Sequence, residues 1–398
     1  MTRDIMTGKR THVVVIGGGY AGTTAANHLR QRHDVDVTLI NPRPRFVERI
    51  RLHQLVAGTA GATADYGTLL GEGVRLVVDS ATKIDTMTRT VQFASGRRGI
   101  QYDYVIYAVG STGAVPASVP GAIEYAHPIA EFEYAEWLRD LLDQLHPDAP
   151  VTVVGAGLTG IETASELAEQ GRTVTLVCGG QLAPSLSAPG RKSIAKWFAK
   201  HGVAVLENDV VAEVRADAVV FADGAVRPSA LTIWTAGFGV PDLAAASGLR
   251  TDALGRLLTD ETLTSLDDVR IVAAGDCAAP SGQPLRMSCQ AAGPLGAQAA
   301  NTVLSRIAGQ EPALLNQAFV GQCISLGRAH GTVQLARTDD TPVNLVVGGR
   351  SAASIKEAIC KGTLWGLRRE ARKPGSTFII KGGRHPVAQD APQVVGNP

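Results

Sequence analysis

Residues 13–22, VVVIGGGYAG, decide the fold of this chain. Four β-branched residues read as a buried strand, and glycines at the spacing G-x-G-x-x-G follow at once. Such a turn is tight, lets a phosphate approach the backbone and lets the next helix pack close to the strand. The free N–H groups at the start of that helix favour an anion. The stretch therefore predicts a dinucleotide site lined by Gly17, Gly19, Tyr20, Ala21 and Gly22.

The same pattern returns 138 residues later, counted from Gly17 to Gly155, in the stretch VVGAGLTGIE at 153–162. Each copy has a β-branched strand, the glycine turn, an alanine-rich helix and a second strand. Each then runs through a β-rich stretch to a closing strand that ends in glycine, VIYAVG at 105–110 and TIWTAG at 232–237. Self-similarity of this length is an internal duplication, so we expect two units of the same α/β type.

A further strand, VRIVAAGD at 269–276, has no glycine turn of its own. It is expected to complete the first sheet, which requires the second unit to be inserted into the first. Its last residue, Asp276, then lies at the carboxyl edge of the sheet, where ligands bind in such folds. A carboxylate at that edge suits a hydroxyl group better than a phosphate.

The second strand of each unit lacks the usual terminal acid. That acid binds the ribose 2′-OH of NADH and repels the 2′-phosphate of NADPH, but the two positions hold Asn41 and Cys178. An amide can still bond a ribose hydroxyl. No arginine follows Cys178 directly to clamp a phosphate, although Arg191 and Lys192 come thirteen and fourteen residues later. NADH, NADPH and a degenerate site all remain open at this stage.

Composition excludes several classes of protein. The 398 residues carry a formal net charge of +1 and 45% hydrophobic residues, so a globular protein is expected and no nucleic-acid partner is indicated. The five cysteines form no C-x-x-C, and the histidines show no metal-binding spacing, so neither a disulfide framework nor a metal site is predicted. No apolar run is long enough for a signal peptide or a membrane-spanning helix, and the expected location is the cytoplasm.

Taken together, VVVIGGGYAG, VIYAVGS, VVGAGLTGIE and VRIVAAGD resemble the two-dinucleotide-binding-domain flavoproteins of the pyridine nucleotide-disulfide oxidoreductase superfamily. Within them the chain is most similar to the type II NADH:quinone oxidoreductase branch, over about residues 10–335. The resemblance implies FAD in the first unit and NADH or NADPH in the inserted one. It also implies hydride transfer from NAD(P)H to the flavin and onward to a quinone or another small acceptor.

Two alternatives to a small acceptor stay open. One is a reductase for a ferredoxin-type protein acceptor, and the other is a catalytically quiet flavin-binding protein. The glutamine that the quinone branch carries before the second long helix is replaced near Met287, whereas Gln290 and Gly293 fit the family pattern. Pro294 is expected in the first turn of that helix, whose N-terminus would face the flavin. A role for the thiols of Cys277 and Cys289 is the minor alternative to buried structural cysteines.

The resemblance also assigns domains and site residues. We expect an FAD-binding domain at 1–115 and 255–315, an NAD(P)-binding domain at 116–254 and a small α+β C-terminal domain with a tail at 316–398. Glu162 is the expected catalytic residue, beside the flavin–nicotinamide contact, with a surface helix carboxylate as the alternative. His53 is a further candidate contact. The remaining cofactor-binding candidates are Asn41, Arg49, Gly110, Gly275, Asp276, Gly155, Gly157, Gly160, Cys178 and Gly237.

The C-terminal part of the chain, residues 316–398, has a different character. Residues 318–336 and 341–349 read as strands, and 354–373 read as a helix. The segment 354–375 carries six basic and two acidic side chains, which leaves +4, together with an incomplete apolar stripe that includes Trp365. A peripheral contact at the inner face of a membrane, packing on its own domain and packing on a homodimer partner explain this pattern equally well. The last residues, 385–398, are predicted to be disordered.

Overall fold

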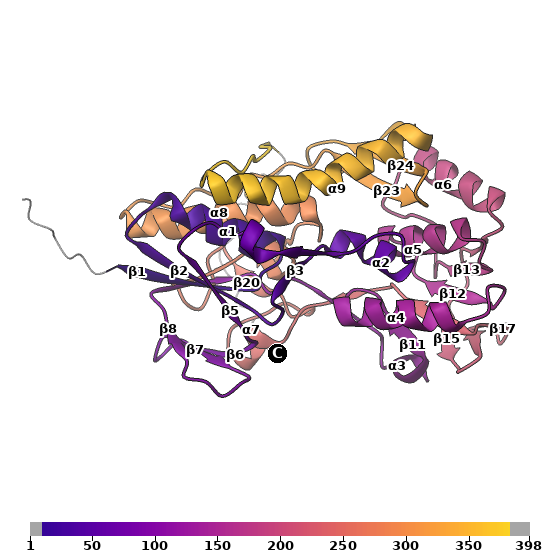
Figure 1. Ribbon diagram of the computed structural model, residues 1–398, viewed down its shortest axis with the longest axis horizontal. Coiled ribbons are helices and arrows are strands. Elements are labelled where there is room, and N and C mark those ends of the chain that lie inside the picture. Colours follow the sequence, from indigo (N-terminus) through magenta and orange to yellow (C-terminus); the bar gives the residue numbers. More distant parts are fainter. Residues whose placement is uncertain (1–9, 383–398) are drawn as a thin grey trace, which may run out of the picture.

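The computed structural model describes residues 10–382, and the tail predicted to be disordered lies outside them. Figure 1 shows two α/β units side by side along the long axis, with a long C-terminal helix lying across the top of both. The predicted fold class, two Rossmann-like units and a small C-terminal α+β domain, is confirmed.

The first unit is built on a five-stranded parallel sheet with the strand order β21-β9-β1-β2-β5. Parallel strands covered on both faces are apolar almost throughout, and residues Val13–Val15 are completely buried. The strands of this sheet are β1 (Thr11–Ile16), β2 (Val35–Asn41), β5 (Val74–Val78), β9 (Tyr104–Tyr107) and β21 (Ile271–Ala273).

The second unit repeats this sheet. Its order is β11-β18-β12-β13-β14, again parallel throughout, so β12, β13, β14 and β18 correspond to β1, β2, β5 and β9. The predicted duplication is therefore visible in the strand order itself. The strands are β11 (Ala126–Pro128), β12 (Val151–Val154), β13 (Val174–Val177), β14 (Ala204–Leu206) and β18 (Leu231–Trp234).

The chain passes from the first sheet to the second and back. It leaves after β9 and returns at β21, and the two connections pair with each other as antiparallel β10 (Thr112–Gly113) and β19 (Phe238–Gly239). The returning strand is shorter than the predicted 269–276, because β21 covers only Ile271–Ala273 and a 3-10 turn, η4 (Gly275–Cys277), follows. The domain boundaries given above stay a prediction.

Helices and small sheets cover the two large sheets. In the first unit they are α1 (Tyr20–His28), η1 (Leu29–Gln31), β3 (Arg45–Val47), η2 (Arg49–Arg51), α2 (Leu52–Val56), β4 (Thr63–Asp65), η3 (Tyr66–Thr68), β6 (Ala81–Asp85), β7 (Thr90–Phe93), β8 (Ile100–Gln101), α7 (Leu243–Ala246), β20 (Leu257–Thr259), β22 (Ala278–Pro280) and α8 (Cys289–Ile307). In the second they are α3 (Ala122–Tyr125), α4 (Phe132–Gln144), α5 (Leu158–Glu169), α6 (Ala188–Lys200), β15 (Val211–Val214), β16 (Ala218–Phe221) and β17 (Val226–Pro228).

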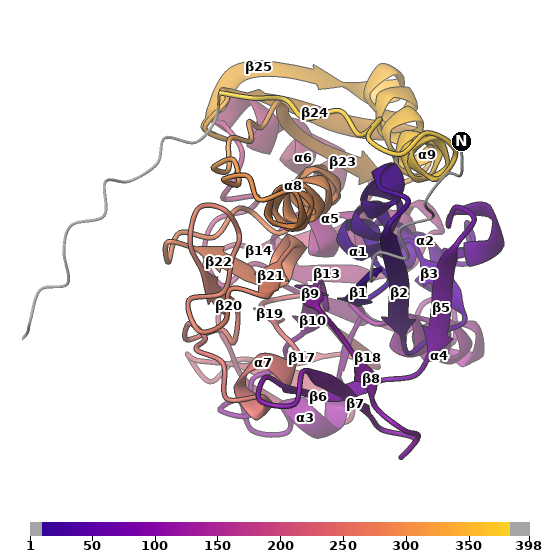
Figure 2. The ribbon, with the colours of Figure 1, turned by 90° about the vertical axis from the view of Figure 1, so that its left-hand side faces the viewer.

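The C-terminal domain is an antiparallel sheet with one long helix. Its elements are β23 (Gly321–Leu326), β24 (His330–Ala336), β25 (Pro342–Gly348) and α9 (Gly349–Arg372), which confirms the strands and the helix expected there. Figure 2 shows this sheet and α9 above α1 and α8. The helix α9 packs against α1 of the first unit, whereas β23 packs against α5 of the second. The C-terminal domain thus joins the two units.

Membrane-spanning helices and clusters of metal ligands were considered over the residues that the structure describes. Within residues 10–382, no helix is both long and apolar enough to cross a bilayer. Over the same residues, no three His, Cys, Asp or Glu side chains gather in a way that could hold a metal ion.

Candidate active site

The first glycine turn prepares the start of α1 for an anion. Gly17 has φ +102°, and a Cβ on Gly22 would lie 1.8 Å from the Gly17 carbonyl oxygen, so only glycine lets α1 come this close to the turn. Gly19 precedes α1, and a Cβ there would meet nothing within 4 Å. No side chain caps the helix. Its first N–H groups are therefore free to bind a pyrophosphate.

Asn41 holds this turn in place from the end of β2. Its Oδ1 accepts a hydrogen bond from the Gly18 N–H at 2.9 Å, and its Nδ2 donates to the Arg43 carbonyl at 2.8 Å. Both ends of the amide are thus engaged within the protein, so Asn41 shapes the turn, and its contact with a ribose stays a prediction. Arg43 itself forms a bidentate pair with Glu133 on α4, both contacts at 2.6 Å, so its guanidinium is engaged within the protein.

Asp276 lies at the carboxyl edge of the first sheet, in the turn that follows β21. Its Oδ2 accepts a hydrogen bond from Ser111 Oγ at 2.7 Å. Arg49 donates through Nη1 to Ser111 O at 2.7 Å and to Ser111 Oγ at 2.9 Å. A Cβ on Gly110 would lie 4.0 Å from the same Nη1. The predicted residues Arg49, Gly110, Gly275 and Asp276 thus meet at the ends of β9 and β21.

Tyr20 and Ala21 place α1 against its neighbours. The Tyr20 ring packs edge-on against Phe46, with 5.0 Å between ring centres. Its hydroxyl is buried and has no hydrogen-bond partner within residues 10–382, and burial raises its pKa well above the usual value. On the next residue, the Ala21 carbonyl lies so close to α8 that a Cβ on Gly296 would meet it at 2.1 Å. The two helices are therefore in backbone contact behind the first glycine turn.

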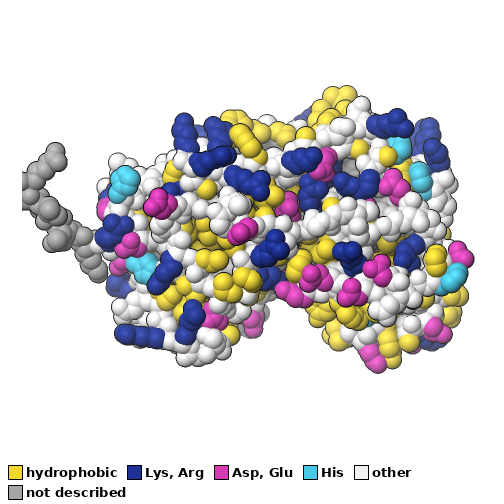
Figure 3. Space-filling view, viewed as in Figure 1, with side chains coloured by type: hydrophobic (Ala, Val, Ile, Leu, Met, Phe, Trp, Pro, Cys, Tyr) yellow, Lys and Arg dark blue, Asp and Glu magenta, His cyan; other side chains and the backbone are white. Residues whose placement is uncertain are grey.

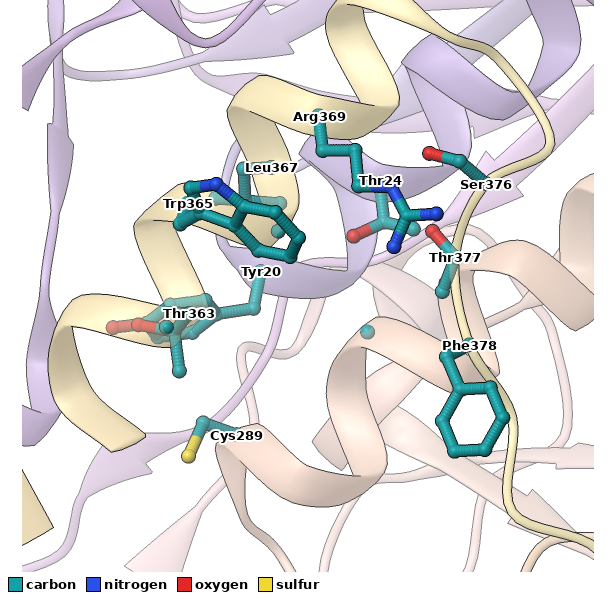
Figure 4. Close-up of a pocket in the computed structure, with 13 residues that line it drawn as sticks. Tyr20, Thr24, Cys289, Thr363, Trp365, Leu367, Arg369, Ser376, Thr377 and Phe378 are labelled. Carbon is teal, nitrogen blue, oxygen red and sulfur yellow. The ribbon is translucent and has the colours of Figure 1, made fainter. Parts of the chain in front are cut away.

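A cavity of about 210 Å³ opens beside Tyr20. It lies between α1, the start of α8, α9 and the segment that follows α9, and Figure 4 shows Trp365 and Arg369 reaching over it from α9. The Arg369 guanidinium lies 5.4 Å from the centre of the Trp365 ring. The wall mixes apolar and polar groups, and its labelled residues are Tyr20, Thr24, Cys289, Thr363, Trp365, Leu367, Arg369, Ser376, Thr377 and Phe378. No sequence pattern pointed to this cavity, because four separate segments contribute to it.

The second glycine turn repeats the geometry of the first. A Cβ on Gly160 would lie 1.9 Å from the Gly155 carbonyl oxygen, whereas a Cβ on Gly157 would meet nothing within 4 Å. No side chain caps α5, which begins one residue after Gly157. Gly237 lies in the connection back to the first unit, beside β19. The second unit therefore offers its own free helix N-terminus to an anion.

Cys178 follows β13 and is half-buried against the apolar core of the second unit. Burial, and then the nearby Glu207 carboxylate, raise the pKa of its thiol to about 12. The side chain is thus a neutral thiol that cannot replace a charged ribose acceptor. Arg191, the first basic residue expected nearby, donates through Nη1 to the Leu186 carbonyl at 2.5 Å.

Glu162 is buried, with 6% of its surface exposed, so the alternative of a surface helix carboxylate is wrong. Its Oε1 lies 2.9 Å from Lys356 Nζ and accepts the Ser325 N–H at 2.9 Å, and its Oε2 lies 3.6 Å from His53 Nδ1. Burial alone would raise the pKa of Glu162, but Lys356, His53 and the Ser325 N–H together lower it. An ionised carboxylate is therefore held where the two units and the C-terminal domain meet.

Two cationic or titratable side chains complete this cluster. Lys356, on α9, also donates to the Cys323 carbonyl at 3.2 Å; burial opposes its charge, but Glu162 raises its pKa above the usual value. His53, on α2, is buried, and burial lowers its pKa to about 4, against the partial opposition of Glu162. Its Nε2 has no hydrogen-bond partner in the described part of the chain. Sequence reasoning missed Lys356, which appeared only as one charge in a basic segment.

The start of α8 departs from the expectation in one respect. The helix begins at Cys289, with Ser288 as its N-cap, so Pro294 lies in the second turn and the prediction of a first-turn proline is wrong. A proline inside a helix has no N–H for the carbonyl four residues earlier, here that of Gln290. That oxygen accepts a hydrogen bond from Gln317 Nε2 at 3.2 Å instead. The side-chain amide of Gln317 thus donates the hydrogen bond that Pro294 cannot donate to the Gln290 carbonyl.

The cysteines are all free thiols. Cys277 is fully buried, with its Sγ 3.3 Å from the Ala274 carbonyl, and burial raises its pKa to about 12. Burial likewise raises the pKa of Cys289, which borders the cavity. Nucleophilic chemistry requires the thiolate. The geometry of Cys277 therefore agrees with a buried structural residue.

The profile of a protein family described as "Pyridine nucleotide-disulphide oxidoreductase" matches residues 11–296, which is more than half of the chain. An NADH dehydrogenase-like protein of Mycobacterium tuberculosis is 30% identical over 381 residues, which cover 88% of this chain and 93% of that protein. The type II NADH:quinone oxidoreductase Ndh of the same organism is 28% identical over 77% of this chain and 74% of its own length. The solved structure of the sulfide:quinone oxidoreductase from Aquifex aeolicus superimposes with a TM-score of 0.77 at 21% identity, covering 92% of this chain and 93% of that one.

Proposed function

Because the chain belongs to the pyridine nucleotide-disulphide oxidoreductase family, in which its relatives are NADH dehydrogenases, we propose that it is an FAD-dependent NADH:quinone oxidoreductase. The observation that carries the proposal is the pair of glycine turns. Each leads into a helix whose N-terminal N–H groups are uncapped, and each leaves open space at its middle glycine. Two dinucleotide pyrophosphates require two such places.

The residues of the first unit fit FAD. The start of α1 would hold the pyrophosphate, since Gly19 offers open space there. Asp276, fixed by Ser111, offers a carboxylate to a ribityl hydroxyl at the carboxyl edge of the sheet. Bound FAD would supply hydride and electron transfer chemistry that no protein side chain provides.

In the second unit, the start of α5 would hold the pyrophosphate of NADH. Glu162 lies on the same helix, in the turn that follows its first four residues, and we propose that its carboxylate borders the bound nucleotide. The buried pair with Lys356 fixes that carboxylate in one position and in its ionised form. We assign Glu162 to the reacting end of the nicotinamide site, where a preorganised charge acts most strongly because water is excluded.

A quinone is the acceptor that the cavity beside Tyr20 favours. The wall is mostly apolar, with hydroxyl groups and one guanidinium along it. Aromatic and aliphatic side chains with a few polar groups are typical of a site for a flat, weakly polar ring. The cavity borders the starts of both α1 and α8, and α1 follows the turn at which we propose the flavin pyrophosphate.

The exposed side of α9 agrees with a quinone that is dissolved in lipid. Ile355, Ile359 and Trp365 are 39%, 42% and 56% exposed. Figure 3 shows dark blue basic side chains and yellow apolar ones alternating along the upper surface, where Figure 1 places α9. A helix with this mixture binds at the surface of an anionic bilayer. We propose such a contact at the membrane face, beside the cavity that Trp365 borders.

The first experiment is anaerobic mixing of the purified yellow protein with NADH while the flavin absorbance is followed. We expect rapid bleaching, and reoxidation when a short-chain quinone is added. If NADH and NADPH both leave the absorbance unchanged, the proposed function is wrong. If bleaching occurs but no quinone restores the colour, only the acceptor assignment is wrong.

A further inference from the structure

The second unit has a carboxylate beside the place where its usual ribose-binding acid is missing. Cys178 occupies that place, packed half-buried against the core. Glu207 is the first residue after β14, the strand that pairs with β13 on the outer side. Because parallel strands end at the same edge of a sheet, residues 178 and 207 come to lie next to each other at the carboxyl edge.

The loop after β13 is fastened to the residues after β14. The Cys178 N–H donates to the Leu206 carbonyl at 2.8 Å, and the Gly180 N–H donates to the Glu207 carbonyl at 2.5 Å. The side chain of Glu207 takes part as well, because its Oε1 accepts the Leu182 N–H at 2.8 Å. These bonds hold the carboxylate in one orientation over the loop, although the residue itself is exposed.

This arrangement leaves half of the carboxylate available. Within residues 10–382, no donor is bonded to Oε2 of Glu207, and no cation forms an ion pair with it. Among the basic side chains of neighbouring elements, Arg227, on β17, donates to Thr175 Oγ1 at 2.9 Å, and two others are at the start of α6. Arg191 already donates to the Leu186 carbonyl, and Lys192 is exposed on the first turns of that helix. The edge of the nucleotide site thus carries a negative charge without a clamp for a phosphate.

We infer that Glu207 replaces the missing acid: its free oxygen accepts a hydrogen bond from the adenine ribose of NADH, and its charge excludes the 2′-phosphate of NADPH. The inference rests on the proposed function and adds the selection of NADH to it. The physical reason is that a charged acceptor bonds a hydroxyl strongly and repels a dianion at the same distance. Glu207, directly after the neighbouring strand β14, therefore provides the selectivity for NADH that Cys178 cannot provide.

The test compares NADH with NADPH in the wild type and in Glu207→Gln. Glutamine keeps an oxygen that can accept the Leu182 N–H, so the loop is expected to stay in place while the charge is lost. We expect the wild type to prefer NADH. In the variant the ratio of kcat/KM for NADH over NADPH falls on the order of tenfold to a hundredfold, through KM, with ferricyanide as acceptor.

A binding measurement gives a second readout without turnover. Calorimetric titration of NAD⁺ and NADP⁺ into the oxidised holoenzyme is expected to show the same loss of preference in Glu207→Gln. Glu213→Gln is the matched control, since Glu213 is a partly exposed glutamate of the same unit that pairs with Arg215 at 2.8 Å. It is expected to leave both ratios unchanged.

The outcomes separate the two proposals. If neither nucleotide reduces the wild-type flavin, the proposed function is wrong. If the flavin is reduced, but the wild type accepts NADPH as well as NADH or Glu207→Gln keeps the wild-type ratio, the inference about Glu207 is overturned while the proposed function stands.

Discussion

The Oε1 atom of Glu162 and the Nζ atom of Lys356 lie 2.9 Å apart in the interior of the protein. One residue belongs to α5 of the inserted unit and the other to α9 of the C-terminal domain. Only 8% and 14% of the two side chains are exposed, so neither charge is solvated well without the other. The pair therefore couples the position of the C-terminal domain to α5, the helix that follows the second glycine turn.

Removal of Lys356 should destabilise the protein strongly. Lys356→Ala leaves the Glu162 carboxylate buried without its main partner, and such a change costs about 3–5 kcal/mol. The measurement is the free energy of unfolding from urea titrations at pH 7. Lys361→Ala is the control, because Lys361 is 74% exposed and pairs only loosely with Glu357 at 3.6 Å. An equal loss of unfolding free energy in both variants would show that the buried pair stabilises the protein no more than the exposed pair does.

The pH dependence of stability should report on His53. Its pKa is about 4 in the folded protein and about 6.5 in the unfolded chain. The unfolded state then binds a proton below pH 6.5 that the folded state does not, so stability is full above that pH and falls as the pH drops toward 4. Between pH 7 and pH 5 the loss attributable to this one group is about 2 kcal/mol.

His53→Gln tests that assignment by removing the titrating group. The variant should lose less stability than the wild type between pH 7 and pH 5, in the same urea titrations. His146→Gln is the control, since His146 is 76% exposed, and it should follow the wild type. A wild-type curve that is flat over this range would contradict a neutral, buried His53.

The two glycine turns can be told apart by two small substitutions. Gly19 and Gly157 both have ordinary negative φ values, and a Cβ at either meets no protein atom within 4 Å. Alanine is therefore tolerated by the fold and obstructs only a ligand that approaches the backbone. Gly19→Ala should reduce the flavin content of the purified protein, read from its visible absorbance. Gly157→Ala should keep the flavin and weaken NADH binding. The opposite result, loss of flavin in Gly157→Ala and weaker NADH binding in Gly19→Ala, would mean that FAD binds to the second unit and NADH to the first.

Glu162→Gln should slow the reaction of NADH with the flavin. Glutamine keeps acceptors for Lys356 and the Ser325 N–H but removes the charge, so the expected fall in the bleaching rate is on the order of tenfold to a hundredfold. Stopped-flow mixing at several NADH concentrations separates this rate from the affinity, which should change little. Glu169→Gln, an exposed position at the end of the same helix, should react as the wild type does. If the Glu162→Gln variant bleaches at the wild-type rate, Glu162 takes no part in the reaction.

The exposed side of α9 should bind anionic membranes. Wild-type protein is expected to sediment with vesicles of phosphatidylglycerol and phosphatidylcholine, and less so as salt is added, because screening weakens the contact of the basic residues. Ile359→Ala combined with Trp365→Ala should reduce binding several-fold. Trp137→Ala on α4, where the ring is 43% exposed, is the control. Binding that is the same for all three proteins would exclude α9 as the contact.

Much of the fold could be predicted from local pattern. The two glycine turns, the strands that precede them and the return of the chain at Ile271 all follow from residues close together in the sequence, because their conformations depend on near neighbours. In both turns, Gly17–Gly22 and Gly155–Gly160, steric exclusion acts between residues five positions apart. The bounds of short strands were less predictable, as β21 shows.

Tertiary structure alone decided which side chains act together. Lys356 meets Glu162, Glu207 lies beside Cys178, and Arg369 reaches over Tyr20 only because separate segments are packed against one another. Burial then decides the charge of each group: it makes His53 neutral and Cys178 an inert thiol, whereas a buried partner keeps Glu162 ionised. The sequence by itself determined that this chain has two α/β units that each begin with a glycine turn, since glycine patterns express a local steric requirement. The charges of the side chains around the two glycine turns depend on distance and desolvation across the whole molecule, and these exist only once the chain has folded.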